Sequence, residues 1–196
     1  MQTQEKRMEN LTKFATVLTK LIEVAYWIGA VAMVVAVVLV AIDPYVPGQL
    51  VWGVGPGAEL STHGFSMVIA GEDGELLVPA LVIFLLTGAL VLGLTAWVFR
   101  DAHLILRTTQ GLTKFSQGKT PFQKDNVRML REMGFFLLAV LVVELVAEVA
   151  AVLALGPEQV ESSVGLNSFA VGILMLCLSQ AFAQGVQMQR DVDGLV

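Results

Sequence analysis

Apolar residues fall into four long blocks along the chain, and most charged residues lie between them or at the ends. The blocks run from about Leu21 to Ile42, Val78 to Phe99, Met133 to Leu155 and Val164 to Ala183. A bilayer core of about 30 Å is crossed by roughly 20 apolar residues in a helix. Within lipid, each backbone N–H and C=O needs a partner in the same segment, which favours helices over isolated strands. The pattern predicts an all-α integral membrane protein, a four-transmembrane-helix bundle forming one domain over residues 1–196.

The segments between the blocks are also patterned. The outer loop, 43–77, has apolar runs at 50–54 and 65–69 and an Asp73-Gly74 turn signal, which together predict a small hairpin-like structure. In the inner loop, 100–131, Leu104, Leu112 and Phe115 recur at spacings of one helical face. We expect the second span to continue as an amphipathic helix that breaks at Gly118 and Pro121. Asp125 or Asn126 is expected to cap the next helix.

Composition and charge place the chain in a membrane and orient it there. Hydrophobic residues make up 56% of the 196 residues and charged residues 15%, which is too apolar for a soluble domain. All 12 Lys and Arg residues lie on one side of the four predicted spans, and the loops on the other side carry only acidic charge. Because Lys and Arg are retained in the cytoplasm, both termini are predicted to be cytoplasmic, in a multi-pass protein of the cell membrane.

The basic residues of the inner loop are candidates for partner or lipid contact: Arg100, Arg107, Lys114, Lys119, Lys124, Arg128 and Arg131. One interpretation is the positive-inside bias together with attraction to an anionic inner leaflet. A second is docking of a cytoplasmic protein, because about 30 structured residues exceed what a turn between two spans requires. Direct nucleic-acid binding is not expected, since no known binding motif or interleaved aromatic residues accompany the charge.

Two carboxyl groups lie within the third apolar block. Glu144 and Glu148 are four residues apart, so they share one helical face. No Lys or Arg lies at their depth, and Thr87, Asn167, Ser168, Ser179 and Gln180 are the candidate hydrogen-bond partners. We hypothesise that at least one of the two carboxyl groups is protonated at neutral pH. They indicate either a proton, cation or cationic-ligand site facing the bundle interior or a polar cluster that fixes helix orientation.

Other chemistry has little support in the sequence. No Ser-His-Asp or Cys-His arrangement is present, so the chain is not expected to be an enzyme. No cofactor or metal is expected, because His63 lacks a second ligand at a suitable spacing. Cys177 is the only cysteine and lies in the fourth block. Gly88, Gly93 and Gly172 are interpreted as points of close helix contact.

The inner loop and the tail resemble a known family. The residues are Gly118-Lys119-Thr120-Pro121-Phe122, Asn126 to Gly134, Phe182 to Met188, and the terminal Asp193-Gly194-Leu195-Val196. These segments resemble a bacterial four-span membrane family of unknown function, domain-of-unknown-function family 2975, with Met188 in place of the usual Leu. Members are often encoded beside a small helix-turn-helix protein, so the resemblance implies a membrane partner of a transcriptional regulator.

Three functions are consistent with these features. The leading hypothesis is a membrane-embedded regulatory or sensory protein of the bacterial inner membrane, which docks a cytoplasmic partner through its basic inner loop. The second is a small proton- or cation-coupled carrier that uses Glu144 and Glu148, for which homo-oligomerisation would be expected. The third is a structural subunit of a larger membrane assembly.

Overall fold

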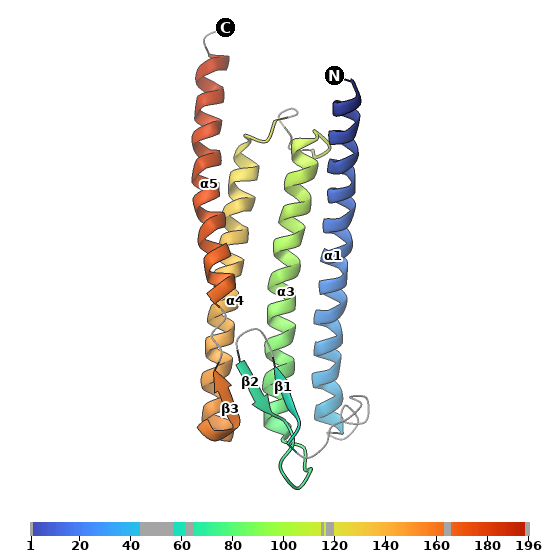
Figure 1. Ribbon diagram of the computed structural model, residues 1–196, viewed down its shortest axis with the longest axis vertical. Coiled ribbons are helices and arrows are strands. Elements are labelled where there is room, and N and C mark those ends of the chain that lie inside the picture. The colour runs from blue at the N-terminus through green and yellow to red at the C-terminus, as the bar shows by residue number, and fades with distance from the viewer. Residues whose placement is uncertain are drawn as a thin grey trace. The chain divides into compact units, whose positions relative to one another are not determined.

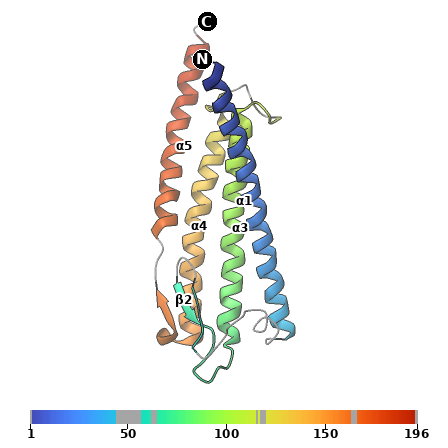
Figure 2. The ribbon, with the colours of Figure 1, turned by 45° about the vertical axis from the view of Figure 1, so that its right-hand side comes forward.

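Four long helices make up most of the protein. The computed structural model describes residues 2–43, 57–61, 65–114, 116, 120–162 and 166–194. The helices are α1 (Gln2–Ile42), α3 (Val78–Thr109), α4 (Lys124–Leu155) and α5 (Leu166–Asp193), shown in Figures 1 and 2. All four are long and apolar enough to cross a membrane, and they pack against one another. The predicted four-helix bundle and multi-pass membrane class are therefore confirmed.

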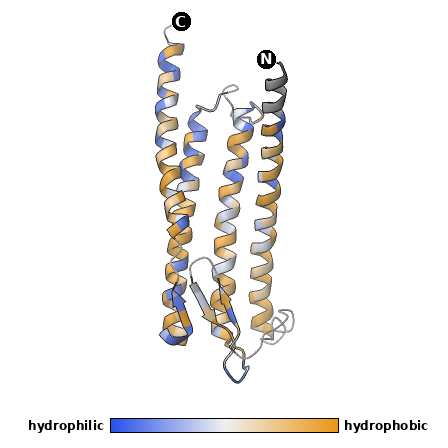
Figure 3. Cartoon of the chain, in the orientation of Figure 1, coloured by the Kyte–Doolittle hydropathy of each residue, from blue (hydrophilic) through white to orange (hydrophobic). Residues whose placement is uncertain are grey.

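The helices are longer than the apolar blocks from which they were predicted. Three ends coincide with block ends, at Ile42, Val78 and Leu155, but α1 begins at Gln2 and α3 continues to Thr109. At 1.5 Å per residue, the 32 residues of α3 span about 48 Å, well beyond a hydrocarbon core of about 30 Å. In Figure 3 polar residues are concentrated toward the helix ends. Each block is therefore the apolar part of a longer helix.

The end of α3 differs from the prediction. The Leu112 N–H donates to the Arg107 carbonyl at 2.9 Å, the Gly111 N–H donates to the Thr108 carbonyl at 3.0 Å, and Gly111 has φ 76°. This is the Schellman pattern, in which a glycine with positive φ ends a helix. The helix therefore stops near Gly111 rather than at Gly118 and Pro121, and Leu112 lies beyond it. Phe115 and Gly118 lie outside the described residues.

The start of α4 also differs. The helix begins at Lys124, so Asp125 and Asn126 lie within its first turn and neither is the N-cap. The Asn126 amide instead donates to the Pro121 carbonyl at 2.9 Å, and the residue is fully buried. Asn126 therefore fixes the segment that precedes the helix. Its side chain binds the Pro121 carbonyl within the fold, whereas the prediction had given it the role of N-cap of the helix.

The loops opposite the basic residues form a three-stranded antiparallel sheet. Strand β1 (Glu59–Ser61) pairs with β2 (Phe65–Val68), and β3 (Val160–Ser162) pairs with the other edge of β2. β2 lies in the predicted run at 65–69, whereas β1 lies outside both predicted runs. The Asp73-Gly74 turn is formed as well, with the Glu75 N–H donating to Asp73 Oδ1 at 3.1 Å. β3 was not predicted. The apolar run at 50–54 lies outside the described residues.

Contacts divide the chain into two compact units. One comprises Met1–Tyr26, Leu94–Leu138 and Phe169–Val196, and the other comprises Trp27–Gly93 and Ala139–Ser168. All 12 Lys and Arg residues belong to the first unit, which we call the basic unit. The second contains only acidic charge and the sheet, and we call it the acidic unit. A division based only on contacts thus reproduces the charge asymmetry of the sequence.

Candidate functional site

A cavity of about 180 Å³ in the acidic unit contains the first predicted site residue. Glu144 of α4 lines this cavity together with Thr87 of α3, and most of the other lining side chains are apolar, among them Met33 and Phe84. Glu144 is 4% exposed and Thr87 is 5% exposed. Two of the predicted polar residues, Glu144 and Thr87, therefore line one cavity within the membrane-spanning part of the chain.

The Thr87 hydroxyl can accept a hydrogen bond from a group in the cavity but cannot donate one. Its Oγ1 donates to the Ile83 carbonyl in the preceding turn at 2.7 Å, which occupies the only hydroxyl hydrogen. The oxygen keeps acceptor capacity, so a donor in the cavity is better matched than an acceptor. A protonated carboxyl group or an ammonium group would supply such a donor.

Three other predicted polar residues, Glu148, Gln180 and Ser179, do not line this cavity. Glu148 is half-buried and does not line the cavity that contains Glu144. Gln180 is exposed and lines a groove in the basic unit. Ser179 donates its hydroxyl to the Leu176 carbonyl at 2.7 Å, within its own helix. Of the predicted polar residues, Glu144 and Thr87 are thus the two that share this cavity.

The basic residues of the inner loop are all exposed where the structure describes them: Arg100, Arg107, Lys114, Lys124, Arg128 and Arg131. Lys119 lies outside the described residues. Arg100 lies over the Trp97 ring, 4.6 Å from its centroid, and Arg128 pairs with Glu132 at 2.9 Å. Exposed ion pairs contribute little to stability, about 0–1 kcal/mol. These side chains are therefore available to a partner at small cost to the fold.

Hydrogen bonds order the connection between α3 and α4. Ser116 donates its hydroxyl to the Thr108 carbonyl at 3.0 Å, and the Thr108 and Thr113 hydroxyls lie 3.1 Å apart. Gln123, which is 2% exposed, donates its amide to the Thr120 carbonyl at 2.8 Å. Thr120 in turn bonds to Gln189 of α5 at 3.0 Å. The described part of the connection is thus held by hydrogen bonds of partly buried or buried polar side chains, and its described cation, Lys114, is exposed.

Asp101 is a buried charge that the sequence reasoning missed. It lies beyond the apolar block that ends at Phe99 and is 4% exposed, with Oδ2 buried and not hydrogen-bonded. Burial raises its pKa to about 6, and nearby Glu132 adds to the shift, while Arg100 and Arg128 oppose it. A signal was present: Asp101 is three residues from Val98 and four from Ile105, both of which belong to the packed core face of α3.

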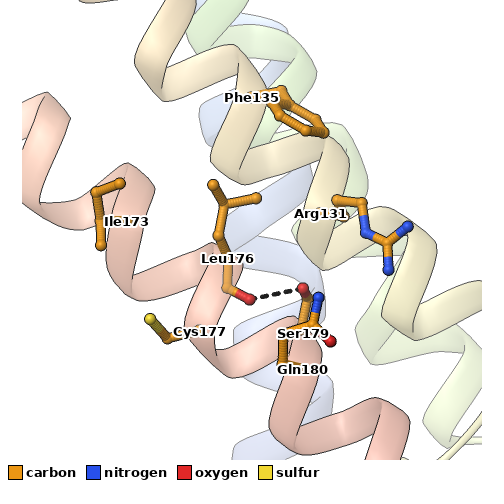
Figure 4. Close-up of a pocket in the computed structure, with 7 residues that line it drawn as sticks. All are labelled: Arg131, Phe135, Ile173, Leu176, Cys177, Ser179 and Gln180. Atoms are coloured by element: carbon orange, nitrogen blue, oxygen red, sulfur yellow. Dashed lines mark hydrogen bonds between the residues drawn. The ribbon is translucent and has the colours of Figure 1, made fainter.

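A groove of about 390 Å³ lies between α4 and α5 in the basic unit (Figure 4). Arg131 and Phe135 line it from α4, and α5 contributes Ile173, Leu176, Cys177, Ser179 and Gln180. Figure 4 shows Arg131 and Gln180 toward one end and Ile173 toward the other. The helices approach closely beside the groove, because a Cβ atom built on Gly134 would lie 3.0 Å from the Gly172 carbonyl oxygen.

A second, smaller hollow of about 200 Å³ lies further along the same pair of helices. Lys124 and Val127 of α4 line it together with Gln187 and Arg190 of α5, and two small apolar residues of α5 complete it. Neither this hollow nor the groove is lined by an acidic residue. The groove and this hollow together form what we call the α4–α5 seam. The seam is apolar within the predicted spans and cationic beyond them.

Comparison with known proteins adds no relative. The chain matches no family model, no curated protein and no solved structure. Membership of the four-span family that the inner loop and tail resemble therefore remains a prediction.

Proposed function

We propose that this protein is a membrane-embedded regulatory or sensory protein of the bacterial inner membrane, with its basic unit in the cytoplasm. The positive-inside bias supports this orientation, because the basic unit contains every Lys and Arg of the chain. The basic unit would then dock a cytoplasmic protein with an acidic surface. The resemblance of the inner loop and tail suggests a small helix-turn-helix regulator as that partner.

The observation that carries the proposal is a set of hydrogen bonds in the described part of the connection, with exposed cations in it and beside it. Thr108 and Gln123 form hydrogen bonds with residues of the connection, Thr113 and Thr120, whereas Arg107, Lys114 and Lys124 are exposed. Positive charge alone would satisfy the topological bias without any order. A fixed array of charges presents one pattern to a partner, which favours specific pairing and a fast encounter.

Orientation is tested first. In a Cys177→Ala background, the exposed Leu112 is replaced by Cys and labelled with a membrane-impermeant maleimide. We expect labelling in inverted membrane vesicles and none in intact spheroplasts. Labelling in intact spheroplasts would place the basic unit outside and remove the proposal.

Docking is tested by photo-crosslinking in cells. A benzoylphenylalanine at Leu112 should form an adduct with one soluble protein, identified by mass spectrometry. Replacing Arg107, Lys114 and Lys124 by Gln should abolish this adduct. The control replaces Lys6, Arg7 and Lys13 by Gln, which removes the same charge from another segment and should leave the adduct intact. Loss in both variants would indicate a general charge effect and contradict a specific docking surface.

A second candidate function is transport of protons or small cations. It is favoured by the cavity that contains Glu144 and Thr87 in the membrane-spanning part of the chain. If it holds, reconstituted vesicles should show a pH-dependent proton or cation flux that Glu144→Gln abolishes and Glu148→Gln reduces less. Vesicles without flux across a range of pH would eliminate this function.

A further inference from the structure

We propose that the α4–α5 groove is a binding site for an anionic phospholipid, with one acyl chain along the apolar wall and the headgroup phosphate at Arg131. The site requires only that the helices cross a bilayer. It is independent of the protein partner proposed above.

The first argument is the position of the groove relative to the apolar blocks. Arg131 lies two residues before the third block, and Gln180 lies three residues inside the end of the fourth. Both therefore lie near the level where a span leaves the hydrocarbon core. Ile173 is seven residues from Gln180 along α5, which corresponds to about 10 Å of depth. The groove thus runs from the headgroup level into the core.

The second argument is the chemistry of the lining. Phe135, Ile173 and Cys177 are exposed at the surface of α4 and α5, so in a bilayer they contact lipid rather than water. Leu176 forms the floor between them, and the volume of about 390 Å³ is in the range of small-molecule sites, roughly 300–1,000 Å³. An acyl chain is the apolar ligand that the surrounding bilayer supplies.

The third argument is charge. Arg131 is exposed at the polar end, where its guanidinium can hold a phosphate by two parallel hydrogen bonds. The Gln180 amide adds donors at the same end (Figure 4). Lys124 and Arg190 raise the positive potential further along the seam, and no acidic residue lines the groove. Basic pockets between transmembrane helices favour anionic over zwitterionic headgroups for this reason.

The closing experiment measures lipid retention by native mass spectrometry of the full chain. Phosphatidylglycerol and phosphatidylcholine with identical acyl chains are compared at equal concentration. The wild-type protein should retain phosphatidylglycerol in preference. Arg131→Gln should weaken that binding about fivefold and leave phosphatidylcholine unchanged, as loss of one surface charge contact predicts. Arg131→Lys should keep part of the preference, and Arg107→Gln, on another helix, should keep all of it.

Cys177 provides a test of the acyl-chain wall in the folded protein. Alkylation of Cys177 with N-ethylmaleimide should reduce retention of both lipids, and a Cys177→Ala variant should be unaffected by the reagent. Glycerol phosphate, which has the headgroup but no chain, should not compete at millimolar concentration. Equal retention of the two lipids by the wild type, or an unchanged preference in Arg131→Gln, would overturn the site, and competition by glycerol phosphate would replace it with a soluble-phosphate site.

Discussion

The basic and acidic units bury different kinds of side chain. Among the described residues, the acidic unit buries apolar groups such as Met67, Ile69 and Leu81, and its only buried polar residues are Glu144 and Thr87. The basic unit buries six polar residues: Glu23, Asp101, Thr108, Gln123, Asn126 and Ser179. Its apolar core is correspondingly smaller.

The two kinds of buried side chain restrict the structure of each unit differently. Apolar packing depends on area and tolerates many similar arrangements, whereas directional hydrogen bonds between polar groups restrict the geometry. In the acidic unit, β1 and β2 pack their apolar side chains against α3 and α4, for example Met67 with Ala80 and Ala147. In the basic unit, hydrogen bonds such as Gln110 to Thr16, at 2.9 Å, link residues far apart in the chain. We infer that the basic unit is built for a fixed surface and the acidic unit for burial.

A strong destabilising effect is expected at the α4–α5 crossing of the basic unit. In Gly134→Leu the new side chain would meet Leu176 and the backbone of Gly172, since even a Cβ atom would lie 2.8 Å from the Leu176 side chain. Overpacking of this kind costs about 1–3 kcal/mol or more. Thermal unfolding in detergent should show a large loss of stability or no folded protein.

Gly93→Leu is the matched control for that substitution. Nothing lies within 4 Å of a Cβ atom built on Gly93, so the same side chain enters open space. Helix propensity should make this variant neutral or slightly more stable. Equal losses in the two variants would show that the Gly134 crossing is not a tight contact.

Met67→Ala tests the acidic unit in the same way. Met67 is 1% exposed and belongs to the core between the sheet and α3 and α4. Truncation of a buried Met to Ala costs about 2–5 kcal/mol. Hydrogen exchange should accelerate in β2 and near Ala151 and stay unchanged from Thr108 to Asn126. Met188→Ala is the control, because that side chain is 69% exposed. Uniform acceleration across the chain would mean that the two units do not open separately.

The sequence predicted the lipid-facing parts of the fold better than the parts in water. Hydropathy measures which residues tolerate lipid, so it placed Ile42, Val78 and Leu155 as helix ends on the acidic side. On the basic side the helices leave the apolar blocks and remain helical, and hydropathy carries no signal for that. Gly111 ended α3 through a positive φ that the spacing of apolar residues does not encode.

The candidate site shows a similar division. Glu144 was found because a carboxyl group inside an apolar block is costly, and Thr87 because it lies at a comparable depth. Gln180, which was grouped with them, lines the α4–α5 groove and not the cavity, because depth along a helix does not give the helix's rotation about its own axis. β3 is three residues long and pairs with β2, about 95 residues earlier in the chain, so no local sequence pattern predicts it. Gly172 was correctly interpreted as a close contact, whereas Gly93 has open space beside it.

Asp101 gives a pH-dependent test of the polar core. Its folded pKa is about 6, above the ordinary 3.8, so the folded state binds the proton more tightly than the unfolded state. The stability that this group contributes is therefore greatest at low pH and declines as pH rises from about 4 to 6 and above. Asp101→Asn resembles the protonated form. Its melting temperature should match the wild type near pH 3.5, below the unfolded pKa, and exceed it by a few degrees at pH 7.5. A difference independent of pH would contradict the raised pKa.

The smallest expected effect on stability lies at Gly111. Substitutions there alter the backbone turn that ends α3 without changing the charge of the basic unit. Gly111 has φ 76°, a conformation that costs a residue with a Cβ atom about 1 kcal/mol. Gly111→Ala should lower stability by that amount, and Gly111→Asn by less, because Asn adopts positive φ more readily. All of the cations remain in both variants. If the ordered connection is what a partner recognises, crosslinking from Leu112 should weaken in the order Gly, Asn, Ala. An unchanged yield would mean that charge alone, without the Schellman turn, is sufficient.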